Sequence, residues 1–281
     1  MVQIGQNSYI DPKAQLADDV IIGPNCYIGP DVIIDVGCKL HNNVTITGRT
    51  FVGKNNEFYQ NSVIGTDPQD LKFKGGETEL IIGSNNIFRE NVTVHRGTEL
   101  GGGKTVIGNG NLFMAGVHVA HDCEITQGVI IANNALIAGH VKLEQSTVIG
   151  GGAGIHHFVT VGKHAMVGGL TRVVTDVPPF MIFEGHPAAV RGVNIIGLSR
   201  SGFTPEEIEN IKQAYRKLFK GQTLRVALKE LQNADNVDVH VQYLIEFIKR
   251  SFKGKYGRYL ETVRTDRPED IKKLIDEETI K

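Results

Sequence analysis

The sequence predicts a mainly β protein, a left-handed parallel β-helix of hexapeptide repeats with a C-terminal α-helical domain. The first observation behind this is an apolar residue at every sixth position, in runs over residues 4–64, 82–94 and 107–173. A period of six matches neither the 3.6 residues of an α-helix nor the simple alternation of a β-strand. It is typical of a solenoid whose short strands are joined by tight turns.

The second observation is a small or β-branched residue two positions before each of these apolar residues, as at Val20 and Val32. Three hexads make one triangular coil, so residues eighteen apart stack about 4.8 Å from each other in neighbouring coils. Cys26, Cys38 and Cys123 all occupy the small inward position, and there is no C-x-x-C pair. We therefore interpret the cysteines as compact core residues.

The third observation is that the repeat is interrupted twice and then ends. We expect residues 1–200 to form the β-helix, with loops at about 66–80 and 97–106, and residues 201–281 to form the helical domain. Insertions in a solenoid usually project as loops on one face, and long loops on a rigid scaffold are frequent functional sites.

The C-terminal region contains several signals for helices. Thr204 is followed by a proline and, three residues on, by Glu207, which predicts an N-cap and a capping box. Apolar spacing predicts a second helix over 224–231 and a third over 239–252, while 264–281 is either a short charged helix or frayed. These helices could cover the open end of the solenoid, which otherwise presents unpaired strand edges.

Composition and charge exclude several classes of function. The chain has 30 Lys and Arg against 31 Asp and Glu, so we expect no nucleic-acid partner. No run approaches the ~18 apolar residues of a membrane span, and no signal peptide begins the chain, which predicts a cytoplasmic protein. Residues 212–258 contain eleven basic and four acidic side chains, either a solvated helix face or a docking surface for an acidic partner.

A cluster of histidines is the candidate for catalysis. His118, His121 and Asp122 are close in sequence, and His140 follows Asp122 by eighteen residues, which stacks it on the next coil. A histidine beside a carboxylate is typical of a general base, although corner histidines can also simply bond along the stack. A zinc site of three histidines, as in carbonic anhydrase-like β-helices, would need imidazoles within ~2.1 Å of one ion. That alternative leaves both loops and the helices unexplained, so we expect no metal and no cofactor.

Four motifs, taken in their order along the chain, resemble those of the UDP-N-acetylglucosamine O-acyltransferase family, whose members are the first enzyme of lipid A biosynthesis. They are QDLKF at 69–73, HRGT at 95–98, AHDC at 120–123 and GVN-x-x-GL-x-R-x-GF at 192–203. The resemblance covers roughly residues 4–260. It implies a homotrimer with sites between subunits, and transfer of an (R)-3-hydroxyacyl chain from acyl carrier protein to the 3-position of UDP-N-acetylglucosamine or its 3-amino analogue.

The resemblance also implies roles for individual residues. His121 would be the general base and Asp122 its orienting partner, and Gly169 would be a ruler that admits a long 3-hydroxyacyl chain. The basic C-terminal helices would receive the acidic carrier protein. The implied substrate contacts are Gln69, Asp70 and Lys72 from the neighbouring chain, His95, His118, His140 and His156 in the cleft, and Asn194 and Arg200 on the nucleotide or the carrier's phosphopantetheine arm.

The chain departs from the family pattern at a few positions, and alternatives stay open. The family's His-Gln-Phe is here His156-His157-Phe158, a common glutamate is Ile196, and the second residue of an arginine pair is Ser201. These departures leave both a 3-hydroxyl and a 3-amino acceptor open. An acetyl-CoA-dependent hexapeptide acetyltransferase is the enzymatic alternative. A purely structural solenoid is the non-enzymatic one, and the histidine cluster argues against it.

Overall fold

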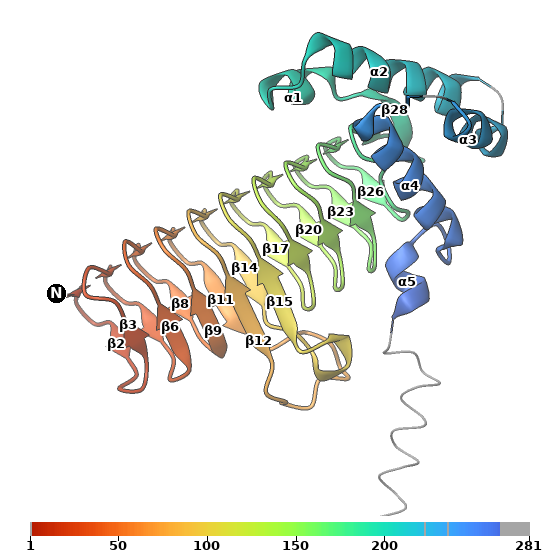
Figure 1. The fold of residues 1–281 in the computed structure, drawn as a ribbon. Coiled ribbons are helices and arrows are strands. Elements are labelled where there is room, and N and C mark those ends of the chain that lie inside the picture. Colours follow the sequence, from red (N-terminus) through yellow and green to blue (C-terminus); the bar gives the residue numbers. More distant parts are fainter. Residues whose placement is uncertain (1, 222, 235, 265–281) are drawn as a thin grey trace, which may run out of the picture.

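The computed structural model describes residues 2–221, 223–234 and 236–264. Over these residues the chain forms a long triangular solenoid of parallel strands, followed by a group of helices at its C-terminal end (Figure 1). This confirms the predicted β-helix with C-terminal helices.

Each side of the triangle is one parallel sheet. The first sheet consists, in spatial order, of β1 (Gln3–Ile4), β4 (Ile21–Ile22), β7 (Lys39–Leu40), β10 (Glu57–Phe58), β13 (Ile87–Phe88), β16 (Leu112–Phe113), β19 (Ile130–Ile131), β22 (Val148–Ile149), β25 (Met166–Val167), β27 (Met181–Glu184) and β28 (Ala189–Val193). The second consists of β2 (Tyr9–Ile10), β5 (Tyr27–Ile28), β8 (Thr45–Ile46), β11 (Val63–Thr66), β14 (Thr93–His95), β17 (His118–Val119), β20 (Leu136–Ile137), β23 (Gly154–Ile155) and β26 (Arg172–Val173). The third consists of β3 (Gln15–Leu16), β6 (Val32–Ile34), β9 (Arg49–Val52), β12 (Glu79–Ile82), β15 (Lys104–Ile107), β18 (Glu124–Ile125), β21 (Lys142–Leu143) and β24 (Thr160–Val161).

The hexad residues fill the interior of the solenoid. From Ile22 to Val173 they are at most 3% exposed, and equivalent residues of successive coils lie directly on one another. The rings of Phe58, Phe88 and Phe113, for example, stack with centroids 4.8 and 4.6 Å apart. Ile4 is 54% exposed because it lies in the first coil, which has no described coil beyond it to cover its inward residues.

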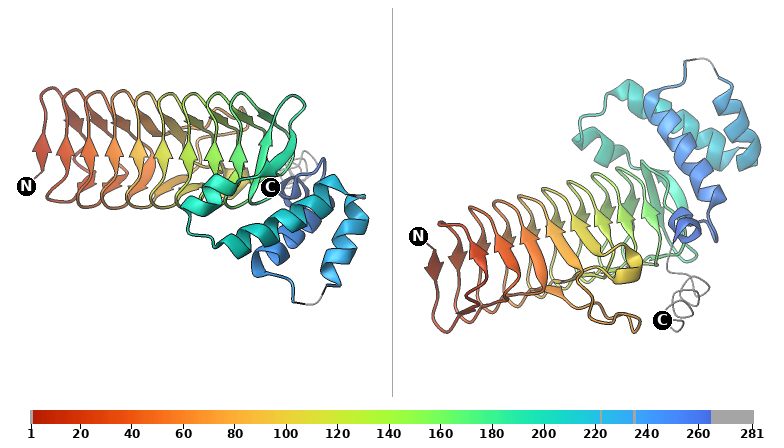
Figure 2. Two further views of the ribbon diagram at one scale, coloured as in Figure 1. Left: turned by 90° about the horizontal axis from the view of Figure 1, so that it is seen from above. Right: turned by 60° about the horizontal axis from the view of Figure 1, so that its bottom comes forward.

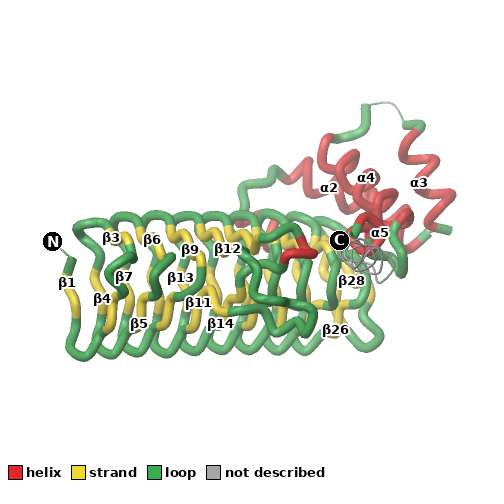
Figure 3. Tube along the Cα trace, turned by 90° about the horizontal axis from the view of Figure 1, so that it is seen from below, coloured by secondary structure: helices red, strands yellow, loops and turns green. Residues whose placement is uncertain are grey.

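Both interruptions of the repeat leave the solenoid at the same corner, where the second sheet turns into the third. The first lies between β11 and β12, and the second, with the short helix η1 (Glu99–Gly101), lies between β14 and β15 (Figure 3). Arg96 anchors the first loop, because its guanidinium pairs with Asp67 at 2.7 Å and donates to the carbonyls of Gly76 and Thr78. The loops therefore lie beside the next coils at that corner.

The helices follow strand β28, which pairs antiparallel with β27 and closes the edge of the first sheet. Thr204 caps its helix through the predicted capping box with Glu207. The helix at 195–200 was not predicted, and it begins before residue 201, the expected start of the helical domain. The helical segments are α1 (Ile195–Arg200), α2 (Pro205–Tyr215), the π-helical turn η2 (Arg216–Lys220), α3 (Leu224–Gln232), α4 (Val239–Lys253) and α5 (Tyr259–Val263).

The helices gather at the C-terminal end, to one side of the last coils (Figure 2). Phe180 and Met181, at the end of the solenoid, pack into one buried cluster with residues of α2, α3 and α4. Over the described residues, none of these helices has the length and apolar character needed to cross a membrane. Of the segment 264–281, for which a helix or a frayed end was expected, all but Arg264 lies outside the described residues.

Candidate active site

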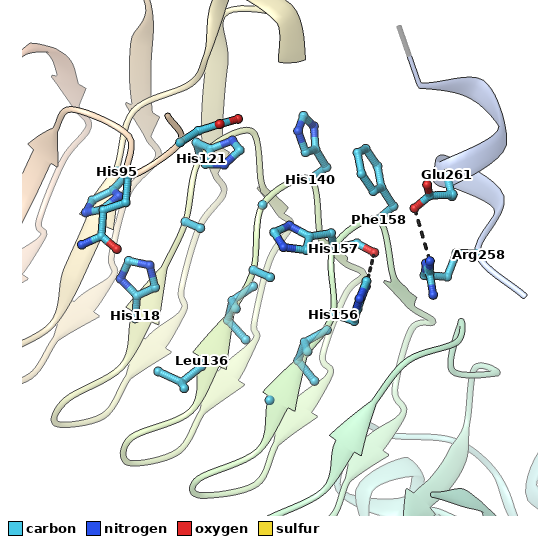
Figure 4. Close-up of a pocket in the computed structure, with 18 of the residues that line it drawn as sticks. His95, His118, His121, Leu136, His140, His156, His157, Phe158, Arg258 and Glu261 are labelled. Carbon is cyan, nitrogen blue, oxygen red and sulfur yellow. Dashed lines mark hydrogen bonds and ion pairs between the residues drawn. The ribbon is translucent and has the colours of Figure 1, made fainter. Parts of the chain in front are cut away.

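A cleft of about 1070 Å³ runs along the corner that carries the loops (Figure 4). Most of the predicted site residues line it, although they come from the first loop and from four successive coils. The predicted residues in its lining are Gln69, Asp70, Lys72, His95, His118, His121, His140 and His156.

His121 and Asp122 form a closely held pair at this corner. Strand β17 ends at Val119, and the chain turns through Asp122, whose φ is 59°. The His121 Nδ1 lies 2.7 Å from the Asp122 Oδ2, so the ring is oriented by the neighbouring carboxylate. Because Nδ1 is used in this way, Nε2 is the ring nitrogen left for a substrate.

The Asp122 carboxylate is itself fixed by Thr98. The Thr98 N–H donates to Oδ1 at 2.9 Å and its hydroxyl donates to Oδ2 at 2.6 Å, while the side chain of Asp122 is only 1% exposed. Thr98 belongs to the HRGT motif, but no role was predicted for it. The second loop separates Thr98 from Asp122 by 24 residues, so the eighteen-residue stacking rule could not find the pair.

Above Asp122 the next coils place two rings in the same corner. The His140 Nε2 lies 3.7 Å from the Asp122 Oδ2, which confirms the stacking predicted from their spacing. The His140 ring meets His121 edge-on at 5.2 Å, and the Phe158 ring lies flat on His140 at 4.4 Å. The corner is thus a ladder of Asp122, His140 and Phe158.

Two further histidines face the cleft as neutral rings. Burial, followed by the nearby His118 and His121, lowers the pKa of His95 to about 4. Burial, followed by His121, also lowers the pKa of His118, whose Nδ1 lies 2.7 Å from the Thr93 hydroxyl. A neutral imidazole offers one donor and one acceptor, which suits contacts with sugar hydroxyls.

The cleft has two chemically different ends. At one end the first loop presents Asp70, Lys72 and the almost fully exposed Leu71. Within one chain these residues share the cleft with His121, and their contribution across a subunit boundary stays a prediction. At the other end Leu136 and Ile155 make an apolar floor, and residues of the C-terminal segment make a wall.

Besides Asp122, which orients His121 from outside the lining, three predicted residues lie outside the cleft. Asn194 is buried as the N-cap of α1, where its side chain accepts from the Gly197 N–H and donates to the His164 carbonyl. Arg200 is exposed at the end of α1, and Gly169 lies at a different corner of the solenoid. Their predicted contacts with substrates stay predictions.

Two donor atoms at this corner lie closer together than the ligands of a zinc ion. Among the described residues, His121, Asp122 and His140 have potential ligand atoms within 4.8 Å of one another. The His121 Nδ1 and Asp122 Oδ2 are 2.7 Å apart, shorter than the roughly 3.4 Å between ligands on tetrahedral zinc with bonds of about 2.1 Å. Since Oδ2 already accepts from Thr98 as well, the arrangement suits a hydrogen-bonded acid–base pair better than a metal site.

Two family models match the sequence. One, described as Udp N-acetylglucosamine O-acyltransferase, Domain 2, matches residues 176–256. The other, described as bacterial transferase hexapeptide (six repeats), matches residues 1–36, 13–48 and 104–139. The first covers the end of the solenoid and most of the helices, and the second covers the repeats.

Curated relatives and solved structures agree with these matches. An acyl-[acyl-carrier-protein]--UDP-N-acetylglucosamine O-acyltransferase of Nautilia profundicola is 47% identical over 205 residues, 72% of this chain and 78% of the relative. The protein of that name from Synechocystis sp. is 46% identical over 74% of this chain and 75% of its own length. The UDP-N-acetylglucosamine acyltransferase structure from Bacteroides fragilis has a TM-score of 0.85 at 40% identity, covering 88% of this chain and 97% of that chain. The structure from Francisella novicida has a TM-score of 0.84 at 36% identity, covering 89% and 91%.

Proposed function

The chain belongs to the UDP-N-acetylglucosamine O-acyltransferase family, and from this premise we propose that His121 is the general base of its reaction. The enzyme is an acyltransferase of lipid A biosynthesis. In our proposal it moves an (R)-3-hydroxyacyl chain from acyl carrier protein to the 3-hydroxyl of UDP-N-acetylglucosamine. The observation that carries the assignment is the buried His121–Asp122 pair with Nε2 left toward the cleft.

The proposed reaction needs one proton acceptor and no further cofactor. His121 Nε2 takes the proton of the sugar hydroxyl as its oxygen attacks the thioester carbonyl carbon. The tetrahedral intermediate collapses to the ester, and the pantetheine thiolate leaves and receives the proton from the imidazolium. Asp122 keeps the proton of the neutral ring on Nδ1 and stabilises the imidazolium while it exists.

Gly139 supports access to Nε2. A Cβ at this position would lie 2.8 Å from the His121 Nε2, so any side chain would clash with this nitrogen. Gly139 is also part of the cleft lining. A glycine here leaves room for the acceptor oxygen beside the base.

Activity with a panel of donors tests the overall proposal. We expect turnover with UDP-N-acetylglucosamine and 3-hydroxyacyl carrier proteins, and none with acetyl-CoA. A preference for acetyl-CoA would contradict the proposal and favour an acetyltransferase. Assays with the 3-amino analogue of the sugar, in parallel, decide between ester and amide formation at the same site.

We infer that the donor chain is long, near the 3-hydroxymyristoyl length. The outer face of the second sheet supports this, because Leu136 is exposed there and a Cβ at Gly154, the next residue in its column, would meet nothing within 4 Å. At Gly169 a Cβ would lie 3.3 Å from the Gly151 carbonyl oxygen. Gly169→Met should shift preference to shorter donors, and an unchanged chain-length profile would place the ruler elsewhere.

The enzyme is proposed to be a homotrimer with sites between subunits. An outward column on the first sheet supports this, because its side chains are apolar over five successive strands: Ile87, Leu112, Ile130, Val148 and Met166. Of these, Ile87, Ile130 and Met166 are exposed in the single chain. Sedimentation should give a trimer, and a stable, active monomer would contradict the proposal.

Mixing of inactive chains tests whether the sites are shared. In one chain Asp70 and His121 line the same cleft, whereas the family resemblance implies that Asp70 acts across the subunit boundary. If the resemblance holds, mixing Asp70→Ala with His121→Ala chains should partly restore activity. No restoration would instead place the whole site within one chain.

The carrier protein is proposed to dock on the basic helices. Exposed basic side chains gather on η2 and α3: Arg216, Lys217, Lys220, Arg225 and Lys229. We expect Lys217→Glu with Lys220→Glu to raise KM for acyl carrier protein, while Lys39→Glu on the solenoid leaves it unchanged. Equal KM values would place docking elsewhere.

The proposed cytoplasmic location is tested by fractionation of the cells that make the enzyme.

A further inference from the structure

Residues 257–264 form one wall of the cleft. The match to the family model of the helical region ends at residue 256, yet Arg258, Glu261 and Arg264 all line the cleft. Figure 4 shows Arg258 and Glu261 at this end, beside Phe158 and His156. The segment thus brings charged groups to the active site from outside the part of the chain that the helical family model describes.

This segment is firmly attached to the last coils of the solenoid. The buried Asp176 carboxylate accepts from the backbone N–H of Tyr259 at 3.1 Å and of Thr160 at 2.8 Å. Arg258 is 8% exposed and donates to the Val174 carbonyl at 2.8 Å. Backbone and side-chain bonds together therefore set the position of α5.

Glu261 connects this anchor to Arg264. One carboxylate oxygen lies 3.4 Å from the Arg258 Nη2, and the other lies 2.9 Å from the Arg264 Nη1. The three side chains are each less than a fifth exposed, so the ion pairs are shielded from bulk water. The guanidinium of Arg264 is held over the corner of the solenoid as a result.

Arg264 completes the ladder of rings that ends at the catalytic pair. Its Cζ lies 4.4 Å from the centroid of the Phe158 ring, which stacks on His140. Phe158 has a φ of 62°, a conformation that is costly for a bulky side chain. Leu170 adopts the same backbone conformation although it is 86% exposed, so the position of the Phe158 ring depends on its contacts with His140 and Arg264 and not on its backbone.

We propose that Arg264 is a positioning residue, which holds Phe158 against His140 and so keeps His140 from competing with His121 for the Asp122 carboxylate. The His140 Nε2 is 3.7 Å from the same Oδ2 that orients His121. This distance is too long for a hydrogen bond, but a small rotation of the His140 ring would shorten it to one. A loosened Phe158 lets His140 donate to Oδ2, and His121 then loses its orienting acceptor. This inference rests on the proposed role of His121.

Kinetics of Arg264 variants test the proposal in the full chain. We expect Arg264→Gln to lower kcat about 3- to 30-fold, the factor that corresponds to a shielded cation–π contact. KM for UDP-N-acetylglucosamine should change by less than about twofold, because the proposal concerns the orientation of the base and not uniform substrate binding. Arg264→Lys, which keeps the cation over the ring, should restore most of kcat.

A second cation–aromatic–histidine stack provides a matched control. The Arg89 Cζ lies 4.5 Å from the Tyr59 ring, which stacks on His41 at 4.4 Å, and Arg89 pairs with Glu90 at 2.9 Å. This stack has the same chemistry but lies outside the cleft lining. Arg89→Gln should therefore leave kcat unchanged, and an equal fall in kcat for both variants would reduce the effect to lost stability.

The competition itself is tested by removing the competing donor. In a His140→Leu background, Arg264→Gln should no longer lower kcat, because no second histidine is left to bind Asp122. An undiminished effect in that background would overturn the proposal. Phe158→Leu should reproduce Arg264→Gln in the wild-type background, so the test does not depend on one substitution.

A spectroscopic measurement without substrate separates this inference from the proposed function. The His140 proton resonances should carry an upfield ring-current shift from the stacked Phe158, and Arg264→Gln should reduce it. An unchanged shift, or kcat equal to wild type, overturns the role of Arg264 even when His121→Ala is inactive. If His121→Ala instead retains turnover, the general base proposal fails and the shift still reports on the stack.

Discussion

Two corners of the solenoid contain a histidine paired with a carboxylate at almost the same distance. His121 Nδ1 lies 2.7 Å from Asp122 Oδ2, and His41 Nε2 lies 2.8 Å from Glu57 Oε1. The side chains of the first pair are 10% and 1% exposed, those of the second 21% and 30%. The length of the bond therefore does not distinguish the proposed catalytic pair from the pair that we interpret as structural.

The surroundings make the difference. Asp122 receives two hydrogen bonds from Thr98, whereas Glu57 is shared with Lys39 at 3.5 Å. Burial alone would raise the pKa of Glu57, but the hydrogen bond from His41 and the charge of Lys39 lower it. His41 also uses Nε2 for its pair and stacks on Tyr59, outside the cleft, so its corner lacks a reacting nitrogen that faces a substrate.

Removal of the two histidines should give the largest contrast. His121→Ala should lower kcat by roughly 10²–10⁴-fold, because a positioned base is lost. His41→Ala should leave kcat within about twofold, since no reacting group is removed at that corner. Steady-state kinetics on both variants measures this, and near-normal turnover by His121→Ala would refute its role as the base.

Neutralising the two carboxylates should give a smaller contrast in the same direction. Asp122→Asn keeps the shape of the side chain but presents an amide that no longer stabilises the imidazolium. We expect a loss of about 10²-fold in kcat, at the lower end of the range for general base catalysis and less than for His121→Ala. Glu57→Gln is the matched control at the other corner, and a comparable loss there would show that the burial of Asp122 is irrelevant.

Thr98 should account for part of the difference between the corners. Thr98→Val removes the hydroxyl that donates to Asp122 Oδ2 and keeps the backbone N–H bond to Oδ1. Loss of one such bond to a charged group corresponds to roughly 1.5–3 kcal/mol, so kcat should fall about tenfold or more. Thr98→Ser, which keeps the hydroxyl, should stay near wild type, and equal kcat for both variants would contradict the assignment.

Acid should affect the two corners in different pH windows. His95, in the candidate cleft, has its pKa lowered to about 4 by burial, so between pH 6.5 and 4 the unfolded chain binds a proton at this residue and the folded chain does not. The free energy of unfolding should therefore decrease as the pH falls through this window, by at most about 1.4 kcal/mol per unit for this group. Glu57, whose pKa is lowered from 4.5, should lose its contribution only below that pH.

Urea unfolding at several pH values measures both windows. His95→Gln should reduce the slope between pH 6.5 and 4, and Glu57→Gln should change the dependence only below about pH 4.5. An unchanged slope in His95→Gln would mean that His95 titrates normally in the folded chain. The two pH windows of the free energy of unfolding would then distinguish the buried cleft from the more open corner without an activity assay.

Much of the site follows from the repeat and was accessible from the sequence. A hexad places two inward residues on one side of the triangle, and three hexads return the chain to the same corner one coil higher. This is why the spacing of Asp122 and His140 predicted their contact. The loop residues near Asp70 were expected at the site from the family resemblance alone, because the loop interrupts the repeat. The capping box at Thr204 was equally predictable, because its residues lie within one helical turn.

Only the tertiary structure decided the contacts that do not follow the period. Thr98 reaches Asp122 across the second loop, whose path depends on its own contacts and has no fixed rise per residue. Asn194, part of a predicted motif, proved to use its amide as the cap of α1, a helix that no apolar period had indicated. Arg264 reaches the catalytic corner because α5 is bound to Asp176 and Val174, far away in sequence. A repeat fixes the distances between coils, whereas the positions of loops and terminal segments depend on hydrogen bonds and ion pairs with residues far away in sequence.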